Sequence, residues 1–158
     1  MEDLGVSLRA ATAADRAHLL RVYASTREEE LAIVPWTGAE KHAFLAMQFD
    51  ARERDYSSRF STDGHFVVER GGVPIGYYWL HRGETELRLL DVALLPEHRG
   101  RGIGTRLMKS LIDEARAKGL PVRLYVLSNG AARRLYDRLG FTAAASEPSV
   151  YQLMELVP

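Results

Sequence analysis

The stretch LLDVALLPEHRGRGIGTRL, residues Leu89 to Leu107, decides which kind of domain this chain forms. Its apolar first part is typical of a strand, and its last part begins a helix with one apolar face. Between them, Gly100, Gly102 and Gly104 stand at alternate positions, interleaved with arginines. Glycine lets backbone N–H groups approach a ligand closely, and the first N–H groups of a helix have no partner within it. The stretch therefore predicts a strand, a loop that binds phosphate, and a helix.

Two familiar phosphate-binding motifs do not fit this context. A dinucleotide-binding loop has the pattern GxGxxG directly after a first strand, with an acidic residue about 20 positions later. Here the glycines run GxGxG, three antiparallel-looking strands precede them, and the residues around Arg123 and Leu124 are basic or apolar. A Walker loop would need GK[ST] at its end, and this loop lacks it. A nucleotide-dependent oxidoreductase is therefore disfavoured.

The rest of the chain indicates an α+β fold in one domain, residues 1–158. The predicted strands are Val6–Ala11, a hairpin from Val67/Val68 through Gly71-Gly72 to Val73–His81, Glu84–Leu94, Val122–Leu127, Phe141–Ala145 and Val150–Leu156. The first predicted helix is capped by Thr12 with Asp15, and the second by Thr37 with Glu40; the second helix is either long or split in two. The third is Ile103–Lys118, and the fourth is short and ends before Gly140. The order is β-α-α-β-β-β-α-β-α-β-β.

Composition excludes several classes of function. Lys and Arg (21) balance Asp and Glu (21), so no overall charge attracts nucleic acid or an anionic membrane. No apolar run approaches the roughly 20 residues of a membrane span, and the acidic N-terminus does not resemble a signal peptide. The chain has no cysteine and its five histidines have no ligand spacing, so we expect no metal site. We expect a cytoplasmic protein; a homodimer is left open.

Two blocks of sequence resemble the GNAT superfamily of N-acetyltransferases. They are VALLPEHRGRGIGTRLM and NGAARRLYDRLGF, and together they cover roughly Glu86 to Phe141. The order of elements along the whole chain is also similar to that fold. The resemblance implies a central mixed, mostly antiparallel sheet with one splayed parallel pair, flanked by about four helices. It further implies acetyl-CoA as cosubstrate, an amine as acceptor and no metal.

The residues that would bind acetyl-CoA follow from the two blocks. The backbone of the glycine loop can wrap a pyrophosphate, and arginines in and near it can neutralise the charge. The resemblance implies that pantetheine pairs with the main chain before the loop and that Asn129 bonds its amide, although Asn129 could also be only a turn residue. The predicted set is Val92, Ala93, Leu94, Arg99, Gly100, Arg101, Gly102, Ile103, Gly104, Thr105, Asn129, Ala132 and Tyr136.

Direct transfer in a ternary complex is the mechanism that this composition allows, since a chain without cysteine cannot form an acyl-cysteine. The backbone N–H of Leu94 would polarise the thioester carbonyl. The resemblance implies that Tyr136 donates a proton to the leaving sulfur. Without the surrounding motif, Tyr136 would be interpreted as a core aromatic.

The acceptor site is harder to predict. In several members of the resembled family a Glu or His on the strand before the bulge removes the proton of the amine, and one such position falls on Arg88, which cannot act as a base. Glu86, on the same face, could do so through water; alternation places Asp91 on the opposite face, so it could serve only if the bulge rotates it.

Arg88 instead suggests an acceptor with both an amine and an acid group, such as an amino acid or peptide, with a plain ion pair to Glu86 as the alternative. The run Glu28–Glu30 is interpreted as a solvated segment rather than an acceptor site. A non-catalytic acyl-CoA-binding module is the competing function.

Overall fold

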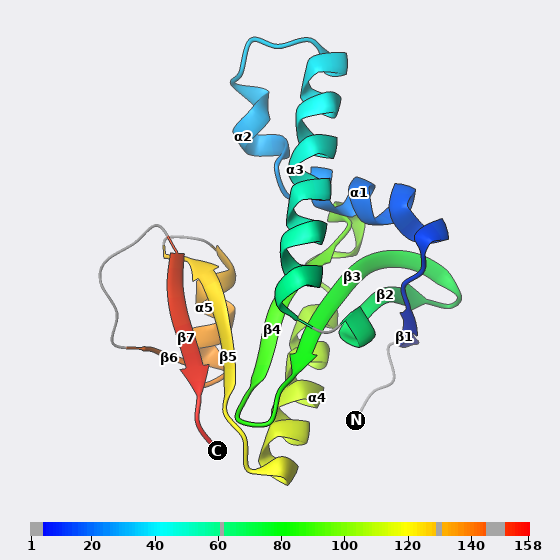
Figure 1. The fold of residues 1–158 in the computed structure, drawn as a ribbon. Coiled ribbons are helices and arrows are strands. Elements are labelled where there is room, and N and C mark those ends of the chain that lie inside the picture. The colour runs from blue at the N-terminus through cyan, green and yellow to red at the C-terminus, as the bar shows by residue number, and fades with distance from the viewer. Residues whose placement is uncertain (1–4, 61, 129–130, 145–150) are drawn as a thin grey trace.

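The computed structural model describes residues 5–60, 62–128, 131–144 and 151–158, and it shows one sheet between two layers of helices (Figure 1). The strands of the sheet lie in the order β1-β2-β3-β4-β5-β7-β6. They are β1 Val6–Ala10, β2 His65–Arg70, β3 Val73–Arg82, β4 Leu87–Leu94, β5 Val122–Leu127, β6 Thr142–Ala143 and β7 Tyr151–Leu156. Every described pair is antiparallel except β4 with β5, which confirms the mixed, mostly antiparallel sheet.

The helices flank the sheet on both faces. They are α1 Arg16–Ser25, α2 Glu28–Ala32, α3 Gly38–Arg59, α4 Ile103–Lys118 and α5 Ala131–Arg138, with short 3-10 helices at Ala13–Asp15, Thr62–Gly64 and Pro96–His98. One core packs α1 to α3 against Val67 and Tyr77 of the sheet. The other packs α4, Tyr136 of α5 and Phe141 against the opposite face. The described part thus has five α-helices rather than about four, because the Glu28 segment forms α2.

Local signals in the sequence explain where several elements begin and end. Thr37 and Glu40 form the predicted capping box: the Glu40 N–H donates to Thr37 Oγ1 and the Thr37 N–H donates to Glu40 Oε1, both at 3.1 Å. The helix that follows is one unbroken helix of 22 residues. Gly71 and Gly72 have φ angles of 57° and 81°, as a tight hairpin turn between β2 and β3 requires.

The parallel pair β4 and β5 separates after three residues. Leu87, Arg88 and Leu89 pair with Val122, Arg123 and Leu124, whereas Leu90–Leu94 have no strand beside them on that edge within the described chain. On its other edge β4 pairs with β3 up to Leu94, and the register shifts so that Leu90 is an extra residue. Figure 1 shows the two strands diverging from their paired ends. The predicted splay and bulge are both present.

The bulge changes which face of the sheet each residue of β4 occupies. Leu87 and Leu89 pack in the core under α4, and so do Val92 and Leu94 beyond the bulge. Asp91 therefore lies on the opposite face, where it accepts a hydrogen bond from Tyr77. The simple alternation that placed Asp91 beside Leu87 and Leu89 is wrong, because the extra residue inverts the pattern.

Candidate active site

The glycine loop ends in a helix start that is open to a ligand. Gly100 and Gly102 have φ angles of 73° and 82°, and a Cβ placed on either would meet no atom within 4 Å. The first backbone bond of α4 runs from the Arg106 N–H to the Gly102 carbonyl at 3.0 Å. The N–H groups that come before Arg106 at this end of α4 have no carbonyl acceptor one turn earlier in the helix. The loop thus fits a phosphate group, which needs close backbone approach and several N–H donors.

Arg99 braces the start of this loop. Its Nε donates to the Leu94 carbonyl at 2.9 Å and its Nη2 donates to Ser25 Oγ at 3.1 Å. Its backbone N–H donates to the Pro96 carbonyl at 3.2 Å. These contacts tie the end of β4 to α1. The guanidinium that the sequence suggested as a phosphate ligand is therefore engaged in holding the loop in place.

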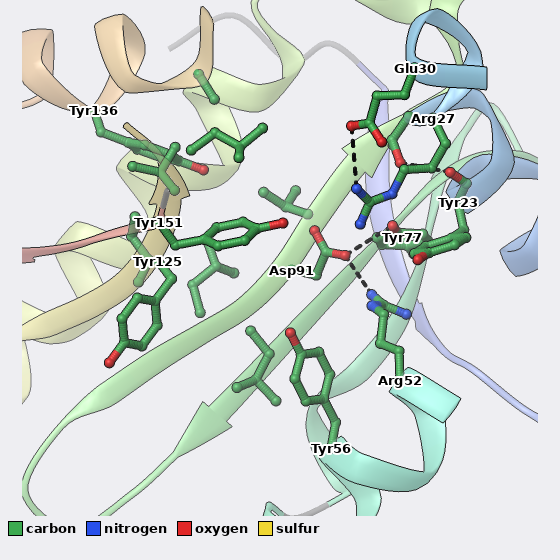
Figure 2. Close-up of a pocket in the computed structure, with 18 residues that line it drawn as sticks. Tyr23, Arg27, Glu30, Arg52, Tyr56, Tyr77, Asp91, Tyr125, Tyr136 and Tyr151 are labelled. Atoms are coloured by element: carbon green, nitrogen blue, oxygen red, sulfur yellow. Dashed lines mark hydrogen bonds and ion pairs between the residues drawn. The ribbon is translucent and has the colours of Figure 1, made fainter. Parts of the chain in front are cut away.

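A pocket of about 590 Å³ lies where β4 and β5 separate, and it is rich in tyrosine. Six of the seven tyrosines of the chain line it, together with Arg27, Arg52, Glu30 and Asp91. Figure 2 shows Tyr136, Tyr125 and Tyr151 on one side and the charged residues on the other. Leu90, Val92 and Ala132 also line the pocket. The open flank of β4 therefore leads into this tyrosine-lined pocket.

Tyr136 is held by core packing, with its ring against Phe141 at a centroid distance of 5.6 Å. Figure 2 shows its hydroxyl directed into the pocket. Burial raises the pKa of Tyr136 to about 12, and the Asp91 carboxylate adds to this shift. The phenol therefore keeps its proton at neutral pH and can donate a hydrogen bond to a group in the pocket.

Asp91 is fixed by an arginine that is itself enclosed in aromatic rings. Asp91 Oδ2 accepts from Arg52 Nη2 at 2.6 Å and from the Tyr77 hydroxyl at 3.0 Å. The guanidinium of Arg52 lies between 5.0 and 5.7 Å from the ring centroids of Tyr23, Tyr56, Tyr77 and Trp79. Burial, followed by the nearby Asp91 charge, raises the pKa of Tyr77 well above its usual value. The Asp91 carboxylate is thus presented to the pocket in one fixed orientation (Figure 2).

Comparison with known proteins identifies the family. A sequence model described as "Acetyltransferase (GNAT) family" matches residues 12–141. The chain belongs to the GNAT acetyltransferase family. A protein of Pseudomonas paraeruginosa called L-methionine sulfoximine/L-methionine sulfone acetyltransferase is 31% identical over 163 residues, which cover 94% of this chain and 87% of that protein.

Other relatives share the domain within longer proteins. The mycothiol acetyltransferase of Thermobispora bispora is 36% identical over 106 residues, 59% of this chain but 35% of that protein. The chain therefore spans about a third of that protein's length. Among solved structures, the PaiA N-acetyltransferase of Thermoplasma acidophilum, in complex with coenzyme A, matches with a TM-score of 0.68 at 17% identity, covering 97% of this chain and 99% of that one. This likeness confirms the GNAT fold.

Glu86 and Arg88 lie at the paired end of β4 and do not line the pocket of this GNAT domain. Arg88 Nε donates to Glu86 Oε2 at 2.8 Å, and Arg123 reaches Glu86 Oε1 at 3.4 Å. Arg88 also lies over the ring of Tyr125. Burial raises the pKa of Glu86, but the hydrogen bonds and charges of the two arginines outweigh it and lower the pKa below its usual value. The ion pair considered as the structural alternative is present.

Sequence reasoning missed the charged side of the pocket. Glu30, from the run Glu28–Glu30 interpreted as solvated, lines it, and so do Arg27 and, on α3, Arg52. No motif marks these positions; the one available signal was an arginine within a helix whose other regularly spaced residues are apolar. Asn129, predicted to bind pantetheine, lies outside the described residues, while Ala93 packs against the core under α1.

Two expected absences concern the described residues only. Across 5–60, 62–128, 131–144 and 151–158, no three His, Asp or Glu side chains are grouped so that they could hold a metal ion. In the same ranges no helix has both the length and the apolar character needed to cross a membrane.

Proposed function

We propose that this domain transfers the acetyl group of acetyl-CoA to the primary amine of a small molecule, amino acid or peptide, by direct attack in a ternary complex. The observation that carries the proposal is the presence of three features together: the open helix start at Gly102, the unpaired edge of β4, and the pocket lined by Tyr136 and Asp91. An anion site, an extended-chain site and a polar pocket together suit a long thioester substrate and a second, amine substrate.

The chain's own groups divide into two binding tasks. The glycine loop, Gly100 to Thr105, would hold the pyrophosphate through backbone N–H groups, with Arg101 adding positive charge. The free edge of β4, Val92 to Leu94, would hold the pantetheine as an added strand. Acetyl-CoA supplies the activated acyl group as a thioester. The remaining groups come from the pocket and from the end of β4.

Polar groups around the pocket would handle charge and protons during transfer. The Leu94 N–H would stabilise the oxyanion, an effect worth about 3 kcal/mol when well aimed. Tyr136 would donate a hydrogen bond to the leaving sulfur. Because the pKa of Tyr136, about 12, lies above that of a thiol, about 8.5, the phenol stabilises the thiolate better than it protonates it.

The acceptor amine needs a carboxylate that faces the pocket. Glu86 was the sequence-based candidate, yet its carboxylate is held by Arg88 and Arg123 away from the pocket. Asp91 lines the pocket beside Val92 and Leu90. We therefore propose that Asp91, rather than Glu86, receives the amine. The name of the Pseudomonas relative, an acetyltransferase of two methionine derivatives, supports a small acceptor with an amine.

An acetyl-CoA thiol-release assay over a panel of amines, amino acids, peptides and aminoglycosides tests this function. We expect thiol release that depends on one class of acceptor. The competing function, a module that binds acyl-CoA without turnover, predicts an increase in melting temperature with acetyl-CoA but no acceptor-dependent release with any amine.

A further inference from the structure

Arg27 presents an unused hydrogen-bond donor to the pocket. It lies between α1 and α2, and its guanidinium is 5.3 Å from the ring centroid of Tyr23. Its Nη1 makes a long contact of 3.4 Å with Glu30, whose side chain is 60% exposed. Its Nε is buried and has no hydrogen-bond partner among the described residues. Because this Nε is fully enclosed by the protein, a ligand in the pocket cannot reach it. Nη2, which is not enclosed in this way and has no partner among the described residues, is the donor that a ligand can contact.

The guanidinium atom that Arg27 leaves unused, Nη2, is one that binds carboxylates elsewhere in this chain. Arg82 contacts Glu114 through Nε and Nη2, at 2.8 and 3.1 Å. Arg88 contacts Glu86 through the same two atoms, at 2.8 and 3.4 Å. This planar fork matches the two oxygens of a carboxylate. Arg27, with Nη1 turned to Glu30 and Nε enclosed, keeps Nη2 available to a carboxylate of a ligand.

Asp91 presents the opposite charge to the same pocket. Both of its hydrogen bonds, from Arg52 and from Tyr77, are accepted by Oδ2. Its Oδ1 has no hydrogen-bond partner among the described residues, and about a third of the side chain is exposed. Figure 2 shows this carboxylate and the Arg27 guanidinium directed into the same space. The pocket therefore has an acceptor for an ammonium group and a charged N–H donor for a carboxylate.

We infer that the acceptor is a free α-amino acid, whose carboxylate binds Nη2 of Arg27 and whose amine binds Oδ1 of Asp91. This inference rests on the proposed acetyl transfer and narrows its acceptor class. Asp91 directly precedes the Val92–Leu94 edge, so an amine held there lies next to the thioester site. Rings of Tyr56, Tyr125 and Tyr151 remain to pack against the side chain of the amino acid.

A peptide N-terminus would satisfy only half of this site, because its first residue has an amide where the amino acid has a carboxylate. The Arg27 guanidinium would then have no carboxylate of the substrate to pair with. A polyamine would place a cation beside Arg27 and Arg52. The charges of the pocket therefore select a zwitterion over both.

Paired acceptors test the inference. L-phenylalanine and L-methionine are compared with their carboxamides, in the parent protein, in Arg27→Met and in Arg27→Lys. Arg21→Met is the matched control, since Arg21 lies on α1, is 68% exposed and has only a 3.7 Å contact with Glu97. The amine of an amide loses its proton more easily than that of the acid, so each acceptor is compared across variants. We expect Arg27→Met to raise the KM of the amino acids about 10- to 100-fold and leave that of the carboxamides nearly unchanged.

Several results would overturn the inference. Equal effects of Arg27→Met on acids and carboxamides, or parent turnover of dipeptides as efficient as that of amino acids, would exclude a carboxylate contact at Arg27. Arg27→Lys keeps the charge but does not place an N–H donor at the position of Nη2, so an intermediate KM supports the inference and an unchanged KM contradicts it.

A binding measurement separates this inference from the proposed function. If the parent protein releases no thiol with any acceptor, acetyl transfer fails, but the amino acid should still raise the melting temperature in the presence of CoA. Loss of that increase in Arg27→Met and in Asp91→Asn, but not in Arg21→Met, supports the zwitterion site. No increase in the parent protein overturns it.

Discussion

The two ends of strand β4 differ in how completely their backbone and charges are paired. At the closed end, Leu87–Leu89, the strand has neighbours on both edges, and Glu86, Arg88, Arg123 and Glu155 form a continuous set of ion pairs. At the open end, Leu90–Leu94, one edge is without a strand, and Asp91 and Arg27 each keep an unused polar atom. Both ends are charged, but only the open end lines the pocket.

This difference shows why charge alone is a poor guide to a site. A carboxylate or guanidinium whose hydrogen bonds are satisfied within the protein has little left for a ligand, whereas one with an unused atom can bind at no cost in broken contacts. The pairing with β5 ends at Leu89, just before the bulge at Leu90, and the bulge turns Asp91 toward the pocket. The open end is therefore where substitutions should affect binding and turnover.

The largest effect is expected from Gly102→Val at the phosphate end of the open region. A Cβ there would occupy the space that the loop leaves for the ligand, and a β-branched residue at φ 82° is strained. Acetyl-CoA at 100 times its Kd should stabilise the parent protein by about 2.7 kcal/mol, and we expect this gain to vanish. NADH should have little effect on either protein.

Gly72→Val is the matched control for that change. Gly72 has φ 81° and equally open surroundings, but it lies in the turn between β2 and β3. It should carry a similar strain and retain the increase in melting temperature with acetyl-CoA. Loss of binding in both variants would attribute the effect to strain rather than to the loop.

A smaller effect, on rate rather than binding, is expected from Tyr136→Phe. The change keeps the packing on Phe141 and removes the hydroxyl, so kcat should fall about 100-fold with little change in acetyl-CoA affinity. Tyr78→Phe is a suitable control, since Tyr78 is buried in the same core but does not line the pocket. Unchanged turnover in Tyr136→Phe would leave Tyr136 as a core residue only.

At the closed end, Arg88→Met should have a modest effect on stability and no selectivity among acceptors. Arg88 is paired with Glu86, so the free energy of unfolding should fall by about 1 kcal/mol. Steady-state kinetics with an amino acid and its carboxamide should show the same small change for both. A loss confined to the amino acid would place the carboxylate fork at Arg88 and contradict the role assigned to Arg27.

The smallest effect is expected in the pH dependence of stability at the closed end. The pKa of Glu86 is lower in the folded protein than in the unfolded chain, so its contribution to stability is present above about pH 4.3 and is lost as the pH falls through the folded pKa. The melting temperature of Glu86→Gln should therefore fall less on acidification than that of the parent protein. Glu29→Gln, on exposed α2, is the control. Equal falls in melting temperature in all three proteins would show that the ion pairs of Glu86 do not contribute to the pH dependence of stability.

The elements and the phosphate loop could be predicted because their signals are local. Gly102 begins α4 and Gly119 ends it because both need positive φ, and Thr37 with Glu40 starts α3, as predicted. The start of β4 was placed three residues early, since nothing in Glu84 to Glu86 distinguishes turn from strand. The two sequence blocks also sufficed to predict the GNAT family.

The acceptor side of the pocket could not be predicted, because it depends on contacts between distant parts of the chain. A single extra residue at Leu90 inverts the faces of β4, and no pattern within the strand reveals it. Arg52, 39 residues before Asp91, meets it only when α3 packs on the sheet. The sequence by itself therefore determined the family, the sheet and the anion loop, which follow from residue type and spacing. The tertiary structure decided which charges are already paired and which, like Arg27 and Asp91, have atoms left for a substrate.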